Sequence, residues 1–282
     1  MSKRNNQQNK QAARERLRAE REKQAKKEKT RRQLVVGGSI VAVLAVAGGI
    51  GVAIANMNEG AETKVSNKEW KSEAKKKAFA KPANTAGDKG TDVVIGKKDA
   101  KNTLTVYEDM RCPVCSSFEQ NTGETLLKDI EDGKYKAQFK MGTFLDDAPQ
   151  ISGSGSKNAL SALGAALNVS PDAFLEYKKV LFDAKNHPKE TEDEFSDDKR
   201  LVELAQDVKS LKDNKNFEKA VKDGTYDKWA LEMSKIFDKA KDEGITGTPA
   251  FQLNGKKLTV GKDNPPMSPE EFTAVVDENL KK

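Results

Sequence analysis

Residues 106–119, Val-Tyr-Glu-Asp-Met-Arg-Cys-Pro-Val-Cys-Ser-Ser-Phe-Glu, hold the only two cysteines of this 282-residue chain, Cys112 and Cys115. β-Branched and aromatic residues precede the pair and helical spacing follows it, so we expect a strand to end and a helix to begin there. Two cysteines this close together cannot form the disulfide framework of a small secreted fold. The pair is therefore either a reactive centre or an inert pair in the core.

The expected position of the pair favours a reactive centre. A cysteine at the start of a helix meets free backbone N–H groups and the positive end of the helix dipole, which favour its thiolate. Pro113 suits the first helical position, where its missing N–H costs no hydrogen bond. The spacing allows a disulfide across one turn. We therefore expect Cys112 to be the exposed nucleophile and Cys115 the more buried, resolving thiol.

The flanking pattern predicts an α/β fold. Residues 93–95 and 104–107 are rich in strand-forming residues, and residues 135–141 alternate as a strand does. The helix after the cysteines ends at Gly133, so strand, helix and strand form a parallel βαβ unit. Residues 156–241 keep helical periodicity and predict an all-helical insertion. A hairpin over residues 250–260 and a helix capped by Ser268 complete the chain.

Residues 34–55 form an uncharged apolar stretch of 22 residues, long enough to cross a bilayer as a helix. Basic residues crowd its amino-terminal side, so the positive-inside rule places residues 1–33 in the cytoplasm as a basic tail. The catalytic part then lies outside the cytoplasm, on a single-pass membrane protein. Ala53, Ile54 and Ala55 also fit a signal-peptide cleavage pattern, which would release the domain instead of anchoring it.

Charge is distributed unevenly along the chain. Residues 1–32 carry 13 Lys or Arg against 4 Glu, so the net charge of +6 comes from the tail, and the other 250 residues sum to −3. A nucleic-acid partner is therefore not expected. Residues 56–90 are polar and lysine-rich and predict a stalk, with one short helix around residues 70–79. Residues 91–282 are expected to form the globular domain.

A second element, Gly247-Thr248-Pro249-Ala250, stands directly before an expected strand. By itself Thr248-Pro249 would be an ordinary turn. Together, however, residues 106–119 and 244–250 resemble the DsbA-like branch of the thioredoxin superfamily, notably its membrane-anchored actinobacterial type. The resemblance covers about residues 91–282 and includes the helical insertion.

This resemblance implies a thioredoxin-like fold and a protein disulfide oxidoreductase without a cofactor, which oxidises or reshuffles disulfides in exported proteins. It implies Cys112 and Cys115 as the redox pair and Thr248-Pro249 as the substrate-binding turn, with a cis bond beside Cys112. Partners are then exported proteins with thiols and a quinone-linked membrane protein that reoxidises the pair.

The chain departs from the family pattern within the redox motif. Val114 replaces the histidine of the strongest oxidants, so a milder potential is expected, with Pro113 and Val114 as tuning residues. Val106 stands where many relatives carry a buried acid for proton transfer. Glu108 and Asp109 are the nearest candidates for that role, or are solvated charges at the end of the strand.

No metal is expected, because a structural zinc site needs four ligands and the sole histidine, His187, lies far from the cysteines in the sequence. Two other functions stay open. The protein could act in reverse, as a reductase for a narrow exported client, because sequence does not set the direction of electron flow. It could also be a chaperone-like binding module in which the cysteines are incidental.

Overall fold

The structure is a computed structural model that describes residues 66–281. The predicted cytoplasmic tail (1–33) and membrane span (34–55) lie outside the described residues. Within residues 66–281, no helix is both long enough and apolar enough to cross a membrane.

A five-stranded sheet forms the centre of the described part, in the order β1-β3-β2-β4-β5. Strands β2 and β3 are parallel, and the other neighbouring pairs are antiparallel. The parallel pair is joined by helix α3 (Pro113–Asp132), so the predicted βαβ unit is confirmed. The strands are β1 (Val93–Ile95), β2 (Thr103–Asp109), β3 (Lys136–Gly142), β4 (Ala250–Leu253) and β5 (Lys256–Lys257).

Helix α3 (Pro113–Asp132) begins and ends where its sequence requires. Pro113 occupies the first turn, and Cys112 is the N-cap. Gly133 closes the helix with φ 80°, a left-handed conformation that glycine adopts without a Cβ clash, and its N–H bonds back to Asp129 and Ile130. The cysteines therefore lie on the first turn of a helix that starts where β2 ends.

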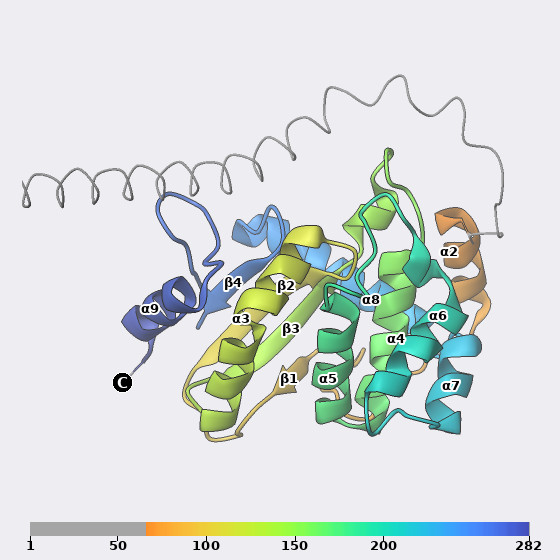
Figure 1. Cartoon of the computed structure of the whole chain (residues 1–282), viewed down its shortest axis with the longest axis horizontal. Helices are drawn as coiled ribbons and strands as arrows, with labels where there is room; N and C mark the ends of the chain where they lie inside the picture. The colour runs from red at the N-terminus through yellow and green to blue at the C-terminus, as the bar shows by residue number, and fades with distance from the viewer. Residues whose placement is uncertain (1–65, 282) are drawn as a thin grey trace, which may run out of the picture. The chain divides into compact units, whose positions relative to one another are not determined.

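The register of the strands shows how the two faces of the sheet differ. Val106 pairs with Phe139 on one side and with Phe251 on the other, so these three side chains share one face. Helices α3, α5 (Pro171–Phe182) and α9 (Pro269–Asn279) cover that face, as Figure 1 shows, through contacts that include Phe118 against Phe251 and Phe139 against Phe174. Tyr107 points to the opposite face and meets Phe237 of α8 (Asp227–Lys239).

The segment between β3 and β4 is helical, as predicted. After the 3₁₀ turn η2 (Phe144–Asp147), α4 (Gly155–Val169) leads into α5, and α8 packs on β3 near the end of the insertion. The other helices of this segment are α6 (Asp198–Leu204) and α7 (Lys215–Lys222), with 3₁₀ turns η3 (Glu194–Ser196), η4 (Ala205–Asp207) and η5 (Ala240–Glu243).

The expectation of a stalk over residues 56–90 does not hold for residues 66–90. Helix α2 (Asn67–Lys76) buries Trp70 and Ala74 in the main core, and the Trp229 indole N–H donates to the Gly90 carbonyl at 2.6 Å. The physical reason is that Trp70 and Ala74, four residues apart, form a narrow apolar stripe within a polar sequence. The globular body therefore begins before residue 91.

Candidate redox site

The site lies where β2 passes into α3. Cys112, the N-cap, has an extended backbone (φ −74°, ψ 116°), so its sulfur faces the first turn of the helix. The Cys115 backbone N–H donates to Cys112 Sγ at 3.4 Å, which is the contact expected of a capping side chain. Both cysteines are free thiols. The helix therefore presents its unpaired N–H groups to the sulfur of Cys112.

The two thiols differ strongly in acidity. The pKa of Cys112 is lowered, chiefly by a hydrogen bond from the Cys115 side chain, although burial acts to raise it. The Thr248 side chain and the Cys115 backbone N–H also lower the pKa of Cys112. The pKa of Cys115 is raised well above its ordinary value, mainly by burial and further by its hydrogen bond to Cys112. The pair is therefore built to hold one thiolate, on Cys112.

The exposure of the two residues follows the predicted order but not the predicted degree. Cys115 is fully buried, whereas Cys112 retains 6% of its surface, so the expectation of an exposed Cys112 is wrong. The turn that contains Thr248 contacts this side chain, because the Thr248 carbonyl oxygen lies 3.7 Å from Cys112 Sγ.

Thr248-Pro249 is cis and lies beside Cys112, which confirms the prediction. The Cys112 thiol is 3.7 Å from the Thr248 carbonyl oxygen. Thr248 Oγ1 is buried and has no hydrogen-bond partner within residues 66–281, so its hydroxyl is free to donate to a thiolate. A cavity of about 230 Å³ borders this turn and is lined in part by Val114, Pro249 and Leu258. Val114, which is 38% exposed, joins this surface to the redox motif.

Glu108 belongs to a buried charged cluster beneath the cysteines. Lys178 Nζ of α5 lies 2.8 Å from Glu108 Oε2 and 2.7 Å from Glu119 Oε1 of α3. Burial raises the pKa of Glu108 to about 8, with Lys178 opposing the shift and Glu119 adding to it. Burial alone would lower the pKa of Lys178, but Glu108 and Glu119 outweigh it and raise that pKa. The charge of Glu108 also raises the pKa of Cys115, which links the cluster to the site.

Asp109 points into a second buried cluster, at the end of β2. Its carboxylate accepts hydrogen bonds from the Arg111 N–H at 3.0 Å, the Leu145 N–H at 3.2 Å and the Ser156 hydroxyl at 2.6 Å. Burial and the charge of Asp146 raise the pKa of Asp109 to about 7, against these hydrogen bonds. Because Glu108 and Asp109 are both fully buried, the alternative of solvated strand-end charges is wrong for both.

Arg111 ties the turn before Cys112 to the helical insertion. Its guanidinium lies 2.9 Å from Asp146 and 3.3 Å from Asp193, and it also donates to the carbonyls of Ile151 and Glu190. The side chain is only 1% exposed, so these contacts replace water around a permanent charge. The turn before Cys112 is thereby fixed to η2 and to the loop before η3.

His187 lies close to the site although it follows Cys112 by 75 residues. Its Nε2 is 3.1 Å from the Met110 carbonyl oxygen, and its ring stacks on Phe182 with centroids 5.7 Å apart. Burial lowers the pKa of His187 to about 4, so the ring is neutral at physiological pH. His187 therefore supports the turn before Cys112 as an uncharged group.

The structure thus brings the predicted residues Cys112, Cys115, Thr248 and Pro249 together, and it places Glu108 below the cysteines. Four further residues around them, two of which are buried, were not predicted. One signal was available, because Lys178 occupies a core position of the pattern Phe174, Lys178, Leu181. The other missed residues, Glu119, Arg111 and His187, carry no such signal.

Comparison with known proteins agrees with this geometry. The sequence model of the family described as Thioredoxin matches residues 88–278. Disulfide bond formation protein D of Bacillus subtilis is 27% identical over 166 residues, which are 58% of this chain and 68% of that protein.

Two solved structures share the fold. Reduced DsbA from Mycobacterium tuberculosis aligns with a TM-score of 0.54 at 22% identity, over 68% of this chain and 94% of that chain. MdbA, a thiol-disulfide oxidoreductase from Actinomyces oris, aligns with a TM-score of 0.54 at 19% identity, over 74% and 97% of the two chains. The chain belongs to the thioredoxin family and is a DsbA-like protein disulfide oxidoreductase.

Proposed function

We propose that this protein forms or reshuffles disulfides in exported proteins, outside the cytoplasm, through the Cys112-Pro113-Val114-Cys115 centre. The observation that carries the proposal is the opposite shift of the two thiols: the pKa of Cys112 is lowered and that of Cys115 is raised. An inert structural pair has no need for such an asymmetry. The Bacillus subtilis relative, whose name refers to disulfide bond formation, supports the same conclusion.

In this mechanism the oxidised Cys112–Cys115 disulfide accepts two electrons from a client dithiol. A client thiolate attacks Cys112 Sγ, which forms a mixed disulfide and releases Cys115 as the leaving thiolate, which is then protonated. The second client thiolate attacks its partner sulfur, and Cys112 leaves as a thiolate. The client gains a disulfide and the enzyme becomes the dithiol. Reshuffling starts from the reduced enzyme: the Cys112 thiolate attacks a client disulfide and releases one client thiolate. A different client thiolate then attacks the mixed disulfide, which forms the new client disulfide and returns Cys112 as the thiolate.

The stabilised thiolate supports one direction of electron flow. Groups that stabilise the Cys112 thiolate stabilise the reduced enzyme, and a stabilised reduced form makes the disulfide a stronger oxidant. The Cys115 contacts and Thr248 act in this direction. We therefore favour the oxidase over the reductase. Val114 in place of histidine keeps the expected potential milder than that of the strongest oxidants.

Thr248 and Pro249 are proposed to hold the client. The Thr248 carbonyl faces Cys112 Sγ, and the neighbouring cavity extends along the same turn past Val114. An extended client segment that pairs with this backbone would bring its sulfur to Cys112.

Glu108 is proposed as the residue that takes and returns the proton of Cys115. With a pKa of about 8, it can be protonated or charged near neutral pH, and its charge acts on Cys115 directly. Asp109 is proposed as a tuning residue for Cys112, because its charge opposes the lowering of the pKa of that thiol. The two acids that follow Val106 thus act on different cysteines.

Residues 34–55 are proposed to anchor the chain, with residues 1–33 in the cytoplasm and the catalytic domain outside. The uncharged 22-residue length and the basic residues that precede it support this topology. A quinone-linked membrane protein is the expected reoxidant. Protease protection that finds Cys112 in the cytoplasm would contradict the topology, and recovery of a mature chain beginning at Asn56 would contradict the anchor alone.

The function is tested by peptide oxidation with the parent protein and with Cys112→Ala. The parent protein should oxidise a reduced dithiol peptide, and the variant should not. A chaperone-like binding module would oxidise the peptide in neither form. The reduction potential of the Cys112–Cys115 couple then separates the two enzymes. A value near about −120 mV supports the oxidase, and one near about −270 mV supports the reductase.

A further inference from the structure

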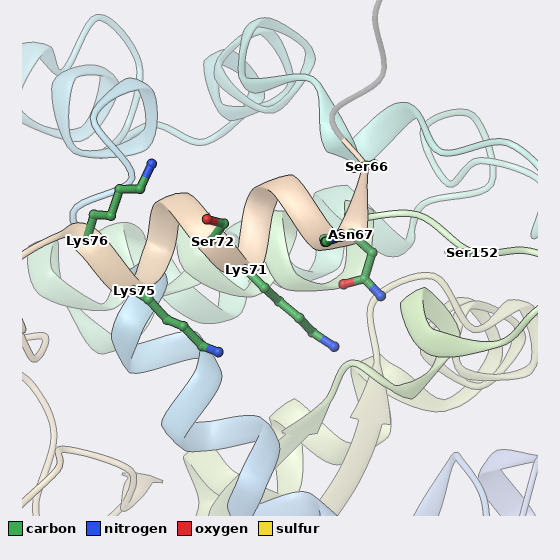
Figure 2. Close-up of a pocket in the computed structure, with 8 residues that line it drawn as sticks. Ser66, Asn67, Lys71, Ser72, Lys75, Lys76 and Ser152 are labelled. Carbon is green, nitrogen blue, oxygen red and sulfur yellow. The ribbon is translucent and has the colours of Figure 1, made fainter.

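A basic groove runs along helix α2, on a part of the domain that the redox chemistry does not use. Its volume is about 740 Å³, and four lysines line it together with serines that include Ser72 and Ser152. Figure 2 shows Lys71 and Lys75 extending from the same side of the helix. The lysines of this groove are Lys68, Lys71, Lys75 and Lys76.

The sequence separates charges around this helix. Lys68, Lys71, Ser72 and Lys75 follow the spacing i, i+3, i+4, i+7, which places them on one face. The acidic residues of α2 face elsewhere and are engaged locally. Glu69 accepts hydrogen bonds from the Ser66 N–H and hydroxyl at the helix start, and Glu73 pairs with Lys76.

The basic face is held rigidly on the body. Trp70 on the opposite side is buried, and its indole N–H donates to Asn158 Oδ1 at 3.2 Å. The Asn67 side-chain amide donates to the Asp146 carbonyl at 2.8 Å. Among the described residues, Lys71 is the one lysine of the face with an acidic partner, the partly exposed Asp147. The other lysines of the face, Lys68 and Lys75, form no ion pair within residues 66–281.

The segment that carries the groove is positively charged, whereas the rest of the domain is negatively charged. Residues 66–77 contain five lysines and two glutamates, a net charge of +3, whereas residues 91–282 sum to −6. Such a distribution turns the α2 end toward an anionic partner and the rest of the domain away from it. Lysine ammonium groups with adjacent serine hydroxyls suit phosphate oxygens.

The length of the chain before α2 selects among anionic partners. Residues 56–66, which connect the proposed span to α2, number 11 and reach at most about 40 Å when fully extended. Under the topology proposed above, these residues keep the groove close to the outer surface of the membrane in which residues 34–55 are anchored. Phospholipid headgroups, which carry phosphate, lie within this reach and attract basic segments close to the membrane when they are anionic.

We propose that the basic groove of α2 binds anionic phospholipid headgroups of the outer leaflet and sets the orientation of the catalytic domain on the membrane. Lys68, Lys71 and Lys75 supply the positive charge, and Ser72 supplies a hydroxyl for phosphate. The interaction is electrostatic, so salt weakens it.

The test uses the full chain reconstituted into phosphatidylcholine vesicles that either contain or lack phosphatidylglycerol. A membrane-impermeant acetylating reagent modifies exposed lysines, and mass spectrometry gives a rate for each. Lys68, Lys71 and Lys75 should react about fivefold or more slowly in the anionic vesicles, since each lysine near such a surface contributes about that factor. Molar salt should remove the difference. Lys98, Lys101 and Lys128, which are exposed elsewhere, should react equally in both.

A matched pair of variants isolates the groove, with Lys76 as the reporter. Replacing Lys68, Lys71 and Lys75 with Gln should abolish the protection of Lys76 in anionic vesicles. Replacing Lys98, Lys101 and Lys128 with Gln removes the same charge and should leave that protection intact.

Equal acetylation rates in the two vesicle types, in protein that resists alkaline carbonate extraction, would overturn the proposal. Protection of the three lysines by soluble polyphosphate, without any effect of the vesicles, would assign the groove to a phosphate polymer and also overturn it. If carbonate extracts the protein but anionic vesicles still protect the three lysines, the proposed span is wrong and the headgroup interaction stands.

Discussion

Replacing Lys178 with Met tests the buried cluster beneath the cysteines. Lys178 is 2% exposed, its partners Glu108 and Glu119 are 0% and 7% exposed, and both ion pairs are shorter than 3 Å. Methionine keeps the apolar stem but removes the charge, so two carboxylates are left without a cation. Breaking a buried pair in this way costs about 3–5 kcal/mol. For a body of this size, that loss corresponds to about 6–20 °C in melting temperature.

The assay is thermal unfolding of the reduced protein, followed by circular dichroism at pH 5 and pH 8. The loss should be larger at pH 8. In the variant, the pKa of the unpaired carboxyls rises further in the folded state, so the folded protein binds more protons than the unfolded one and gains stability as the pH falls. The control is Lys179→Met, which removes the adjacent, exposed lysine and its pairing with exposed Glu124. This variant should melt with the parent.

Two results would refute the reasoning. If Lys178→Met melts together with Lys179→Met, the cluster does not stabilise the fold. If the loss is the same at pH 5 and pH 8, it arises from packing and not from unpaired charge.

Three further predictions concern the site and are checked with purified protein. Cys112 should be alkylated before Cys115, with a pKa below the free-thiol value of about 8.5. The Cys115→Ala variant should accumulate mixed disulfides with client proteins, and the Cys112→Ala variant should accumulate none. Faster alkylation of Cys115 would reverse the assigned roles. Thr248→Val should raise the pKa of Cys112 by about one unit, read from the pH profile of alkylation, and an unchanged profile would exclude the Thr248 hydroxyl as a donor. Burial raises the pKa of Glu108 from 4.5 to about 8, so its contribution to stability is present below pH 4.5 and is lost as the pH rises through 8. The Glu108→Gln variant should therefore show a weaker dependence of the unfolding free energy on pH in urea titrations. An unchanged pH dependence would assign it to other titratable groups.

Local signals made much of the fold predictable. The strand pattern before Cys112, Pro113 at the helix start and Gly133 at its end each act within a few residues, and the structure has all three where the sequence puts them. The helical insertion was predictable for the same reason, since α5 begins at the cap Ser170 and Pro171. In α2, by contrast, only Trp70 and Ala74 are buried, which is too weak an apolar pattern to distinguish a docked helix from a stalk.

The surroundings of the cysteines were less predictable because their contacts are distant in the chain. Lys178 reaches Glu108 over 70 residues, and His187 reaches Met110 over 77. The Cys112 thiol also contacts Thr248, which is 136 residues away in the sequence. Periodicity shows that a residue faces the core, but only the packed insertion decides which charge it meets there.

The contact between His187 and the Met110 carbonyl also gives the protein an internal spectroscopic probe. The chain has a single histidine, so an NMR spectrum contains one set of imidazole resonances and needs no labelling scheme to assign it. Because the pKa of this ring is about 4, its signals do not shift with protonation near neutral pH. A change in them during a redox titration therefore reports movement of the turn that precedes Cys112, measured in the unmodified protein.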